Sequence, residues 1–191
     1  MNHLAHLFLA GDDADSLLGN LSGDFVKGPL ADRFTEPIRR GIMEHRRIDS
    51  FTDSHPAVAG FRRVLIPDHG HYARIIADVF FDHFLATTWL SWSEEPLPRF
   101  LSRVFATLDP RVNDMPERLR HVYPRMRDGR WFQSYATTGG IQGALTQMSG
   151  RLSRPHRLEA ATRHLTDSRA ELEAHFRRFF PDVIQFARGL R

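Results

Sequence analysis

Apolar residues recur every three or four positions along most of the chain, which is the period of an α-helix with one buried face. In the segment at 15–27, for example, Leu17, Leu21 and Phe25 share this spacing. Almost no stretch alternates apolar and polar residues as a half-buried strand does. The pattern therefore predicts an all-α fold, a single compact multi-helix domain over residues 1–191. The other predicted helices span 36–53, 57–65, 71–91, 96–108, 114–127, 141–153, 155–178, with an internal break, and 181–189.

Capping and helix-breaking residues set the expected ends of these helices. Thr35 is suited to cap the second helix, because its hydroxyl can accept a hydrogen bond from a backbone N–H of the first turn. That helix is expected to end near Ser54, because the next residue precedes a proline and is biased away from the helical conformation. Pro67 and Gly70 are expected to close the shorter helix that follows.

The composition is that of an ordinary globular protein, with 191 residues of which 41% are hydrophobic and 26% charged. The chain has no cysteine, so disulfides and thiolate metal sites are excluded, and any metal must bind His, Asp, Glu or Asn. The N-terminal MNHLAHLFLAG has no Lys or Arg, and His3 and His6 interrupt it. It resembles neither a signal peptide nor a membrane-spanning helix, so we expect a cytoplasmic protein.

Charge is distributed unevenly along the chain. Residues 1–55 carry six basic and nine acidic side chains, a net charge of −3, whereas residues 110–191 carry fifteen and eight, a net charge of +7. The acidic residues gather where the histidines are densest. This separation suits a cation site in the first region and an acidic partner for the second.

The helix at 71–91 is apolar on nearly all of its faces, which is typical of a buried helix. It nevertheless contains Asp78 and Asp82, one turn apart, with His83 beside the second. Two carboxylates on one buried face repel each other, and they are costly to bury unless a positive group lies against them. That group is either an arginine, such as Arg46, or a divalent cation.

Two further helices carry polar residues at intervals of four, which places these residues on one helix face. Three predicted helices therefore offer oxygen or nitrogen ligands in mostly apolar surroundings. Mg²⁺ and Mn²⁺ favour carboxylate oxygens, and a mixed set of carboxylates and imidazoles suits Mn²⁺ or Fe²⁺. The alternative is a buried network of Asp–Arg and Asp–His pairs that fixes how the helices pack. The polar residues of the two further helices are Ser16, Asn20 and Asp24, and His45, Asp49 and Asp53, with His55 close behind.

Five segments are distinctive in combination, although each is weak alone. They are MNHLAHLFLA at the start, SLLGNLSGDFVKG at 16–28, GIMEHRRIDSFTDSHP at 41–56, DVFFDHFL at 78–85 and, more weakly, MSGRLSR at 148–154. Their order and spacing resemble those of the acyl carrier protein phosphodiesterases, also called acyl carrier protein hydrolases. The resemblance covers nearly the whole chain.

The resemblance implies an all-α fold distantly related to the HD-domain phosphohydrolases. It also implies an activity, the removal of 4′-phosphopantetheine from holo-acyl carrier protein with the help of a divalent metal ion. That ion is expected to be Mn²⁺, with Mg²⁺ and Fe²⁺ as further candidates. The resemblance makes Asp24 essential, and it does not settle which side chains touch the metal. The expected metal-site residues are Asp24, Asp49, Asp78, Asp82 and His83.

These residue types can perform the chemistry of phosphodiester hydrolysis. A metal ion held by Asp24 and its neighbours would offset charge on the phosphodiester and lower the pKa of a bound water. His45 or His83 can transfer a proton, although His45 could equally be a metal ligand. Arg46 can hold a phosphoryl oxygen through its planar guanidinium. The expected catalytic residues are therefore Asp24, His45 and Arg46; His6 could join them, but a lone histidine among leucines is more often a core residue.

Acyl carrier proteins are small and acidic, so the resemblance implies a positively charged docking face. The arginine-rich segment at 118–130 is the candidate, with a contribution from the loop around Lys27. A solvated helix and turn would carry the same charges, so the segment alone does not demonstrate docking. The expected substrate-binding residues are Asn20, Lys27, Arg118, Arg125 and Arg127.

Other functions fit part of the pattern. An HD-type phosphohydrolase acting on a nucleotide or another small phosphoester would keep the metal site, and a non-catalytic carrier-protein docking module would use the polar rows for packing alone. A nucleic-acid binder explains the arginines but not the aspartate rows, and no predicted helix has a basic face interleaved with aromatic residues. We therefore expect no nucleic-acid partner and no membrane partner, and the sequence carries no sign of the oligomeric state.

Overall fold

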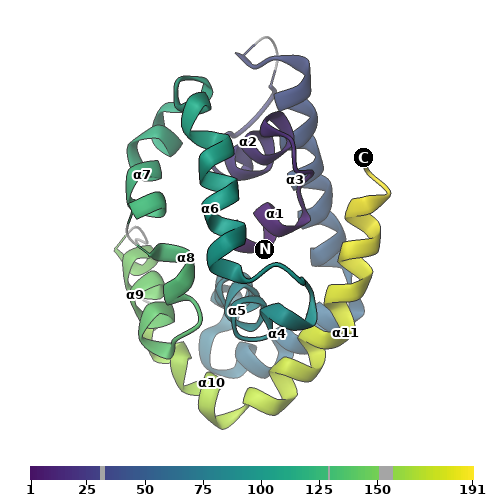
Figure 1. Cartoon of the computed structure of the whole chain (residues 1–191). Helices are drawn as coiled ribbons and strands as arrows, with labels where there is room; N and C mark the ends of the chain where they lie inside the picture. The colour runs from purple at the N-terminus through teal and green to yellow at the C-terminus, as the bar shows by residue number, and fades with distance from the viewer. Residues whose placement is uncertain (31–32, 129, 151–156) are drawn as a thin grey trace.

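Helices make up the regular secondary structure over residues 1–30, 33–128, 130–150 and 157–191, the ranges that the computed structural model describes (Figure 1). These ranges contain no β-strand, which confirms the predicted all-α class. The α-helices are α1 (His3–Leu9), α2 (Ala14–Ser22), α3 (Glu36–Ser54), α4 (Pro56–His69), α5 (Ala73–Thr87), α6 (Leu97–Leu108), α7 (Glu117–Asp128), α8 (Trp131–Ser134), α9 (Thr138–Ser149), α10 (His164–Asp167) and α11 (Arg169–Arg188). Short 3₁₀ turns are η1 (Gly23–Phe25), η3 (Gly70–Tyr72), η4 (Trp89–Ser91), η5 (Asp109–Asp114) and η6 (Leu158–Arg163).

Helix α5 lies at the centre of one continuous core, as its apolar faces predicted. It packs against α1, α4, α9 and α11, and Phe80, Phe81 and Phe84 are fully buried. Burying one such side chain stabilises a fold by about 1.5–3 kcal/mol. The rings also contact aromatic neighbours, Phe61 of α4 edge to face and Phe176 of α11 in a stack. These contacts fix the rotation of α5 and therefore the direction of its few polar side chains.

Glycines allow α2 and η1 to approach α3 closely. A Cβ on Gly19 would lie 2.6 Å from the Cα of Gly41, so this crossing has no space for a side chain. A Cβ on Gly23 would lie 2.2 Å from Cγ of the His45 ring. The backbone of η1 thus packs directly on this imidazole, which brings Asp24 beside α3.

Two predicted helix boundaries are wrong because prolines are accommodated inside helices. Helix α4 continues through Pro67 to its last turn, and α11 continues through Pro181, where two separate helices were predicted. A proline inside a helix removes one backbone hydrogen bond and costs about 3 kcal/mol. Phe180 and Val183 flank Pro181 and are fully buried, so packing of this helix outweighs the local cost.

Other segments differ from the predicted pattern because they are short or interrupted. Helices α1 and α8 were not predicted, since both are shorter than the window in which helical periodicity can be recognised. The helix predicted at 71–91 is divided into η3, α5 and η4. Helix α9 begins three residues before the predicted start at 141. Residues 151–154, which include the end of that predicted helix and of the MSGRLSR segment, lie outside the described ranges.

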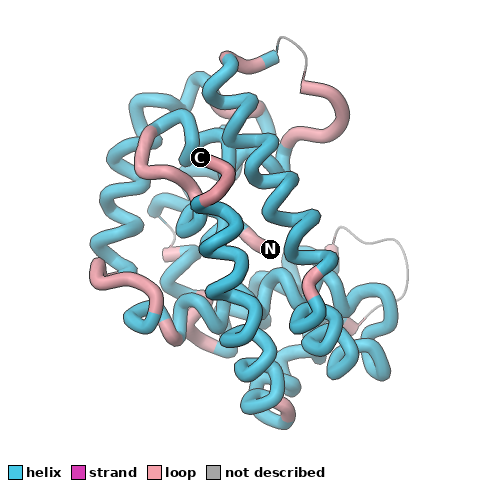
Figure 2. The backbone as a smooth tube through the Cα atoms, turned by 90° about the vertical axis from the view of Figure 1, so that its right-hand side faces the viewer, coloured by secondary structure: helices cyan, strands magenta, loops and turns pink. Residues whose placement is uncertain are grey.

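Helices α7, α8, α9 and α11 lie on two sides of the domain. In Figure 1, α7, α8 and α9 lie on the left and α11 lies on the right, where it packs along α3 and α4. The N-terminal residue lies between these two sides, near the middle of the view. Figure 2 looks onto the side formed by α11. None of the described helices combines the length and the apolar character needed to cross a membrane.

Candidate active site

Carboxylate and imidazole side chains converge where α1, η1, α3 and α5 meet. Helix α3 contributes a histidine and an aspartate one turn apart, as their spacing predicted, and η1 and α5 each contribute an aspartate. Helix α1 contributes two histidines that also lie one turn apart. We call this group the carboxylate–histidine cluster; its members are His3, His6, Asp24, His45, Asp49 and Asp78.

His45 lies at the centre of the cluster. Its Nε2 is 3.3 Å from Oδ2 of Asp49 and 3.5 Å from Oδ1 of Asp24. Its Nδ1 is 2.8 Å from the carbonyl oxygen of Asn20, so Nδ1 donates a hydrogen bond to this carbonyl. The backbone of α2 thereby fixes the ring so that Nε2 faces both carboxylates. A histidine oriented by a backbone carbonyl in this way is typical of metal ligands.

The two carboxylates control the protonation of His45. Burial opposes the charged form, but hydrogen bonds to Asp24 and Asp49 outweigh burial and raise the pKa of His45 to about 9. Burial alone would raise the pKa of both aspartates, yet hydrogen bonds from histidines hold these pKa values well below the usual range. At neutral pH two carboxylate charges therefore face an imidazolium. A metal ion on Nε2 would have to replace this proton.

A second positive group lies on the other side of Asp49. The α-amino group of Met1 is 2.9 Å from Oδ1 of Asp49 and 3.2 Å from Oδ1 of Asp78. Burial disfavours the charged amine, but the two carboxylates raise its pKa to about 11. Burial also raises the pKa of Asp78, an effect that the ammonium partly offsets. The positive group that the sequence required beside Asp78 is thus an ammonium rather than an arginine.

His6, His45 and Asp49 could hold a metal ion. One ligand atom from each lies within 4.8 Å of the others, and the two imidazole rings stack with their centroids 3.6 Å apart. Burial, together with the charge of His45, lowers the pKa of His6 to about 3, so this ring is neutral, as a metal ligand must be. Nδ1 of His6 is buried without a hydrogen-bond partner among the described residues. Two imidazoles and a carboxylate match the ligand preferences of divalent transition metals.

The carboxylates lie at the open side of the cluster, and the imidazoles of His6 and His45 form its buried floor. The side chain of Asp24 is 40% exposed, and those of Asp49 and Asp78 are 31% and 28% exposed. The rings of His6 and His45 are 0% and 3% exposed. A ligand can therefore reach the cluster from the side of Asp24.

Asp82 was predicted to bind metal, but it caps α1. Its carboxylate accepts hydrogen bonds from the backbone N–H groups of Leu4 and Ala5 at 2.9 and 3.0 Å. The first N–H groups of a helix have no partner within the helix, and a carboxylate satisfies them well. Burial raises the pKa of Asp82 to about 7 despite these bonds. Through this contact Asp82 positions α1, and with it His3 and His6.

His83 and Arg46 have partners outside the cluster. Nδ1 of His83 is 2.7 Å from the carbonyl oxygen of Tyr135, and its Nε2 is 3.2 Å from a guanidinium nitrogen of Arg169. The guanidinium of Arg46 donates to two carbonyl oxygens in the loop after η1. The structure thus places both side chains in contacts outside the cluster, and their predicted contacts with metal and phosphate stay predictions.

The later part of the GIMEHRRIDSFTDSHP segment at 41–56 forms contacts between helices. Asp53 pairs with Arg62 at 2.6 Å and with Arg74. Nε2 of His55 is 3.1 Å from a carboxylate oxygen of Asp182. These ion pairs connect α3 with α4, α5 and α11, so the segment divides between the cluster and the helix interfaces.

The predicted substrate-binding residues lie in three different settings. Asn20 is fully buried, and its side chain donates within the α2–α3 interface. Lys27 is exposed in the loop after η1. Arg118 and Arg125 are exposed on α7 and form no ion pair within the described ranges, whereas Arg127 pairs with two aspartates.

His3 and His6 are the site residues that the sequence pattern missed. No role was predicted for His3, and a core position was favoured for His6. Their spacing of three would place them on one face of a helix. This spacing could be interpreted only if a helix had been predicted at the start of the chain, and none was. The signal available in the sequence was the pair of histidines in HLAH, residues 3–6, considered together with the aspartates further along the chain.

The helical fold and the cluster together define a class, all-α proteins with a candidate metal site built from histidines and aspartates. A family model described as acyl carrier protein phosphodiesterase matches residues 1–183, and the chain belongs to this family.

Similar proteins carry the same description. The acyl carrier protein phosphodiesterase of Serratia proteamaculans is 34% identical over 189 residues, which cover 98% of this chain and 98% of the relative. That of Klebsiella pneumoniae strain 342 is 35% identical over 188 residues, which cover 98% of this chain and 97% of the relative. No solved structure matches the chain, so the relation to the HD-domain phosphohydrolases stays a prediction.

Proposed function

We propose that this chain hydrolyses the phosphodiester between 4′-phosphopantetheine and the serine of holo-acyl carrier protein. The products are the apo-protein and free 4′-phosphopantetheine. Membership of the acyl carrier protein phosphodiesterase family supports this substrate. The observation that carries the proposal is the convergence of Asp24 and Asp49 on Nε2 of His45 at an open side of the domain. Such a group can move protons and, with a divalent cation bound, would offset the negative charge of the diester, and hydrolysis requires both.

A divalent metal ion fits the cluster, held by His6, His45 and Asp49 with Asp24 and Asp78 close by. When bound, the ion would offset charge on the phosphodiester and lower the pKa of water. We propose Mn²⁺, because a site that mixes imidazoles with carboxylates suits it better than Mg²⁺, which favours oxygen ligands. Fe²⁺ shares these ligand preferences and is the second candidate.

Asp24 and His3 are the proposed groups that handle water and protons. Asp24 is ionised at neutral pH, because histidine hydrogen bonds lower its pKa against the effect of burial, and it is the most exposed carboxylate of the cluster. It can therefore accept a hydrogen bond from the attacking water and orient it. As the oxygen of water bonds to phosphorus, the water gives up a proton to solvent through the exposed carboxylate of Asp24. As the bond to the serine oxygen breaks, the serine oxygen takes up a proton. His3, whose Nδ1 is 3.2 Å from Oδ2 of Asp24, is placed to supply it.

The carrier protein is proposed to dock on α7. Arg118 and Arg125 are exposed and seven residues apart, so they lie on one face of this helix. Neither forms an ion pair with another described residue, so both are available to an acidic partner. Lys27, exposed beyond η1, would extend the same positive surface toward the cluster.

The direct test is mass spectrometry of holo-acyl carrier protein incubated with the protein and Mn²⁺. The wild type should remove the mass of one phosphopantetheine group, and EDTA or Asp24→Ala should prevent this loss. Asp53→Ala is the matched control, because Asp53 is also a partly exposed aspartate but pairs with arginines outside the cluster. It should retain activity. No loss of mass with wild-type protein and several divalent metals would overturn the proposal, and activity on nucleotides alone would favour a small-substrate phosphohydrolase.

A further inference from the structure

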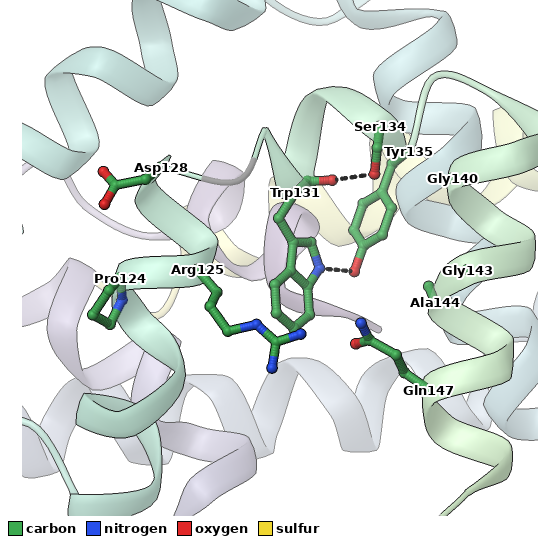
Figure 3. A pocket seen from close by; sticks show the side chains of 10 residues that line it. All are labelled: Pro124, Arg125, Asp128, Trp131, Ser134, Tyr135, Gly140, Gly143, Ala144 and Gln147. Carbon is green, nitrogen blue, oxygen red and sulfur yellow. Dashed lines mark hydrogen bonds between the residues drawn. The ribbon is translucent and has the colours of Figure 1, made fainter.

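An open groove lies between α7, α8 and α9, outside the carboxylate–histidine cluster. Its volume is about 580 Å³, within the range of about 300–1,000 Å³ that is typical of small-molecule sites. In Figure 3 the side chains of Arg125, Trp131 and Gln147 point toward one another, and α9 forms the opposite wall with Gly143 and Ala144. We propose that this α7–α9 groove binds the pantetheine arm of the carrier protein, an inference that rests on the function proposed above.

A second, smaller hollow connects the groove with the cluster. It has a volume of about 60 Å³ and shares four lining residues with the groove, and its other walls include His3 and Phe25. Phe25 directly follows Asp24 in the chain, and Nδ1 of His3 is 3.2 Å from the carboxylate of Asp24. The two hollows therefore lead from the surface at α7–α9 to the exposed side of the cluster. A phosphodiester bound at Asp24 has its arm directed into this passage.

The lining of the groove matches the chemistry of the arm. Beyond its phosphate, pantetheine is an uncharged chain with amides, a hydroxyl, methyl groups and a terminal thiol. The indole of Trp131 and the small residues of α9 offer apolar surface to such a chain. The side-chain amide of Gln147 forms no hydrogen bond with any described residue and can pair with an amide of the arm.

Hydrogen bonds and close packing hold the walls of the groove in place. Nε1 of Trp131 donates to the hydroxyl of Tyr135 at 2.6 Å, and the same hydroxyl accepts from Nδ2 of Asn2 at 3.0 Å. Helix α9 packs directly on α8, since a Cβ on Gly140 would lie 2.0 Å from the carbonyl oxygen of Ser134. A preformed site avoids part of the ordering cost that binding a flexible chain otherwise incurs.

Gly143 provides a way to fill the groove without disturbing the fold. A Cβ at this position meets no atom within 4 Å, so a larger side chain would extend into the groove. Gly139, one turn earlier on α9, has equally open surroundings but does not line the groove. Leucine is more favourable than glycine in a helix, so Gly143→Leu and Gly139→Leu should affect helix stability similarly. The two variants differ mainly in whether the groove is blocked.

The test compares these two full-length variants on holo-acyl carrier protein in the presence of Mn²⁺. We expect Gly143→Leu to lower kcat/KM about tenfold or more, because the enzyme loses binding energy from a remote part of its substrate. Gly139→Leu should match the wild type. Binding of free 4′-phosphopantetheine, followed by tryptophan fluorescence, should weaken by a similar factor in Gly143→Leu. The fluorescence change should disappear in Trp131→Phe, since Trp131 lines the groove.

Failure of the groove inference and failure of the proposed function give different results. If the wild type releases no 4′-phosphopantetheine, the proposed function is wrong and the groove loses its proposed ligand. If the wild type is active but Gly143→Leu retains wild-type kcat/KM and wild-type affinity for 4′-phosphopantetheine, the groove inference alone is wrong. Circular dichroism establishes whether each variant is folded. Should Gly143→Leu not fold, Gln147→Ala must weaken binding of 4′-phosphopantetheine for the inference to stand.

Discussion

The polar side chains of the carboxylate–histidine cluster are held by their neighbours, whereas two exposed polar side chains of the α7–α9 groove are not. The cluster comes from helices packed in and around the core, and each member has a polar contact with a neighbour. Arg125 and Gln147 of the groove are exposed, and no described residue holds either side chain by a hydrogen bond. Fixed charges suit a reaction, whose groups must lie at set positions, whereas exposed polar groups suit recognition of a flexible chain.

The uneven charge of the sequence follows from the same division. Asp24 and Asp49 of the acidic region gather at the cluster, where imidazoles and an ammonium balance them. The basic region supplies Arg118 and Arg125 on α7, which lack acidic partners within the described ranges. If reaction and recognition are separate, variants of the cluster should mainly change kcat, and variants around the groove should mainly change KM.

The largest effect is expected from Asp49→Asn. Asp49 contacts His6, His45 and the amino group of Met1, so neutralising it removes the charge that orients all of them. We expect kcat to fall roughly 10³-fold, as for loss of a group needed for proton transfer, while KM changes little. Steady-state hydrolysis of holo-acyl carrier protein, followed by mass spectrometry, gives both constants.

The matched control for this variant is Asp68→Asn. Asp68 also lies beside a pair of histidines, His69 and His164, but it is bound by Arg163 near the surface. An arginine thus occupies the place that a cation would need, and Asp68→Asn should have wild-type kcat and KM. Equal losses in the two aspartate variants would remove the distinction between the cluster and the rest of the domain.

The second prediction concerns stabilisation by metal, measured without any substrate. An ion that binds only the folded protein stabilises it by about 2.7 kcal/mol at 100 times its Kd. For a chain of this size the melting temperature should rise by roughly 5–10 °C. We expect calorimetry to show this rise with Mn²⁺ for the wild type and for His164→Ala, but not for His6→Ala. The same rise in all three proteins would place the ion outside the cluster.

The third prediction separates a capping role from a ligand role at Asp82. Asp82→Ala leaves the buried N–H groups of Leu4 and Ala5 without a partner, which should lower the free energy of unfolding by about 2 kcal/mol. Urea unfolding measures this loss. Asp13→Ala removes an exposed hydrogen bond from the backbone N–H of Ser16 to the side chain of Asp13, which caps the start of α2. This variant should lower the free energy of unfolding by about 1 kcal/mol or less. If Asp82→Ala abolished metal binding without loss of stability, Asp82 would be the ligand that the sequence predicted.

Asp82 is also an example of a residue whose contacts could not be predicted from the sequence. It lies one turn from Asp78 on the same helix. The helical period therefore places both side chains on one face and does not distinguish their roles. Only the fold places the start of α1 against Asp82 and leaves Asp78 beside Asp49. By contrast, His45 and Asp49 lie on one long helix, so their spacing was enough to pair them.

The helix boundaries, too, were predicted correctly where local signals set them and wrongly where tertiary contacts did. Helix α3 was predicted to within one residue because its apolar period is long and Pro56 follows it, although the hydroxyl of Thr35 makes no capping bond. The prolines of α4 and α11 misled the prediction because the packing that offsets their cost comes from distant parts of the chain. Local signals thus locate long helices, and tertiary contacts decide which polar residues meet.

The smallest effect is expected on α7, from reversing the charges of Arg118 and Arg125 to glutamate. Exposed charge pairs contribute about 1 kcal/mol or less, so KM should rise roughly fivefold at low salt while kcat stays unchanged. The rise should shrink as added salt screens the charges. The control is Arg177→Glu with Arg178→Glu, which makes the same change in net charge on α11, on the side of the domain away from α7 (Figure 1). An equal rise in KM for this pair would mean that overall charge, and not a docking surface on α7, attracts the carrier protein.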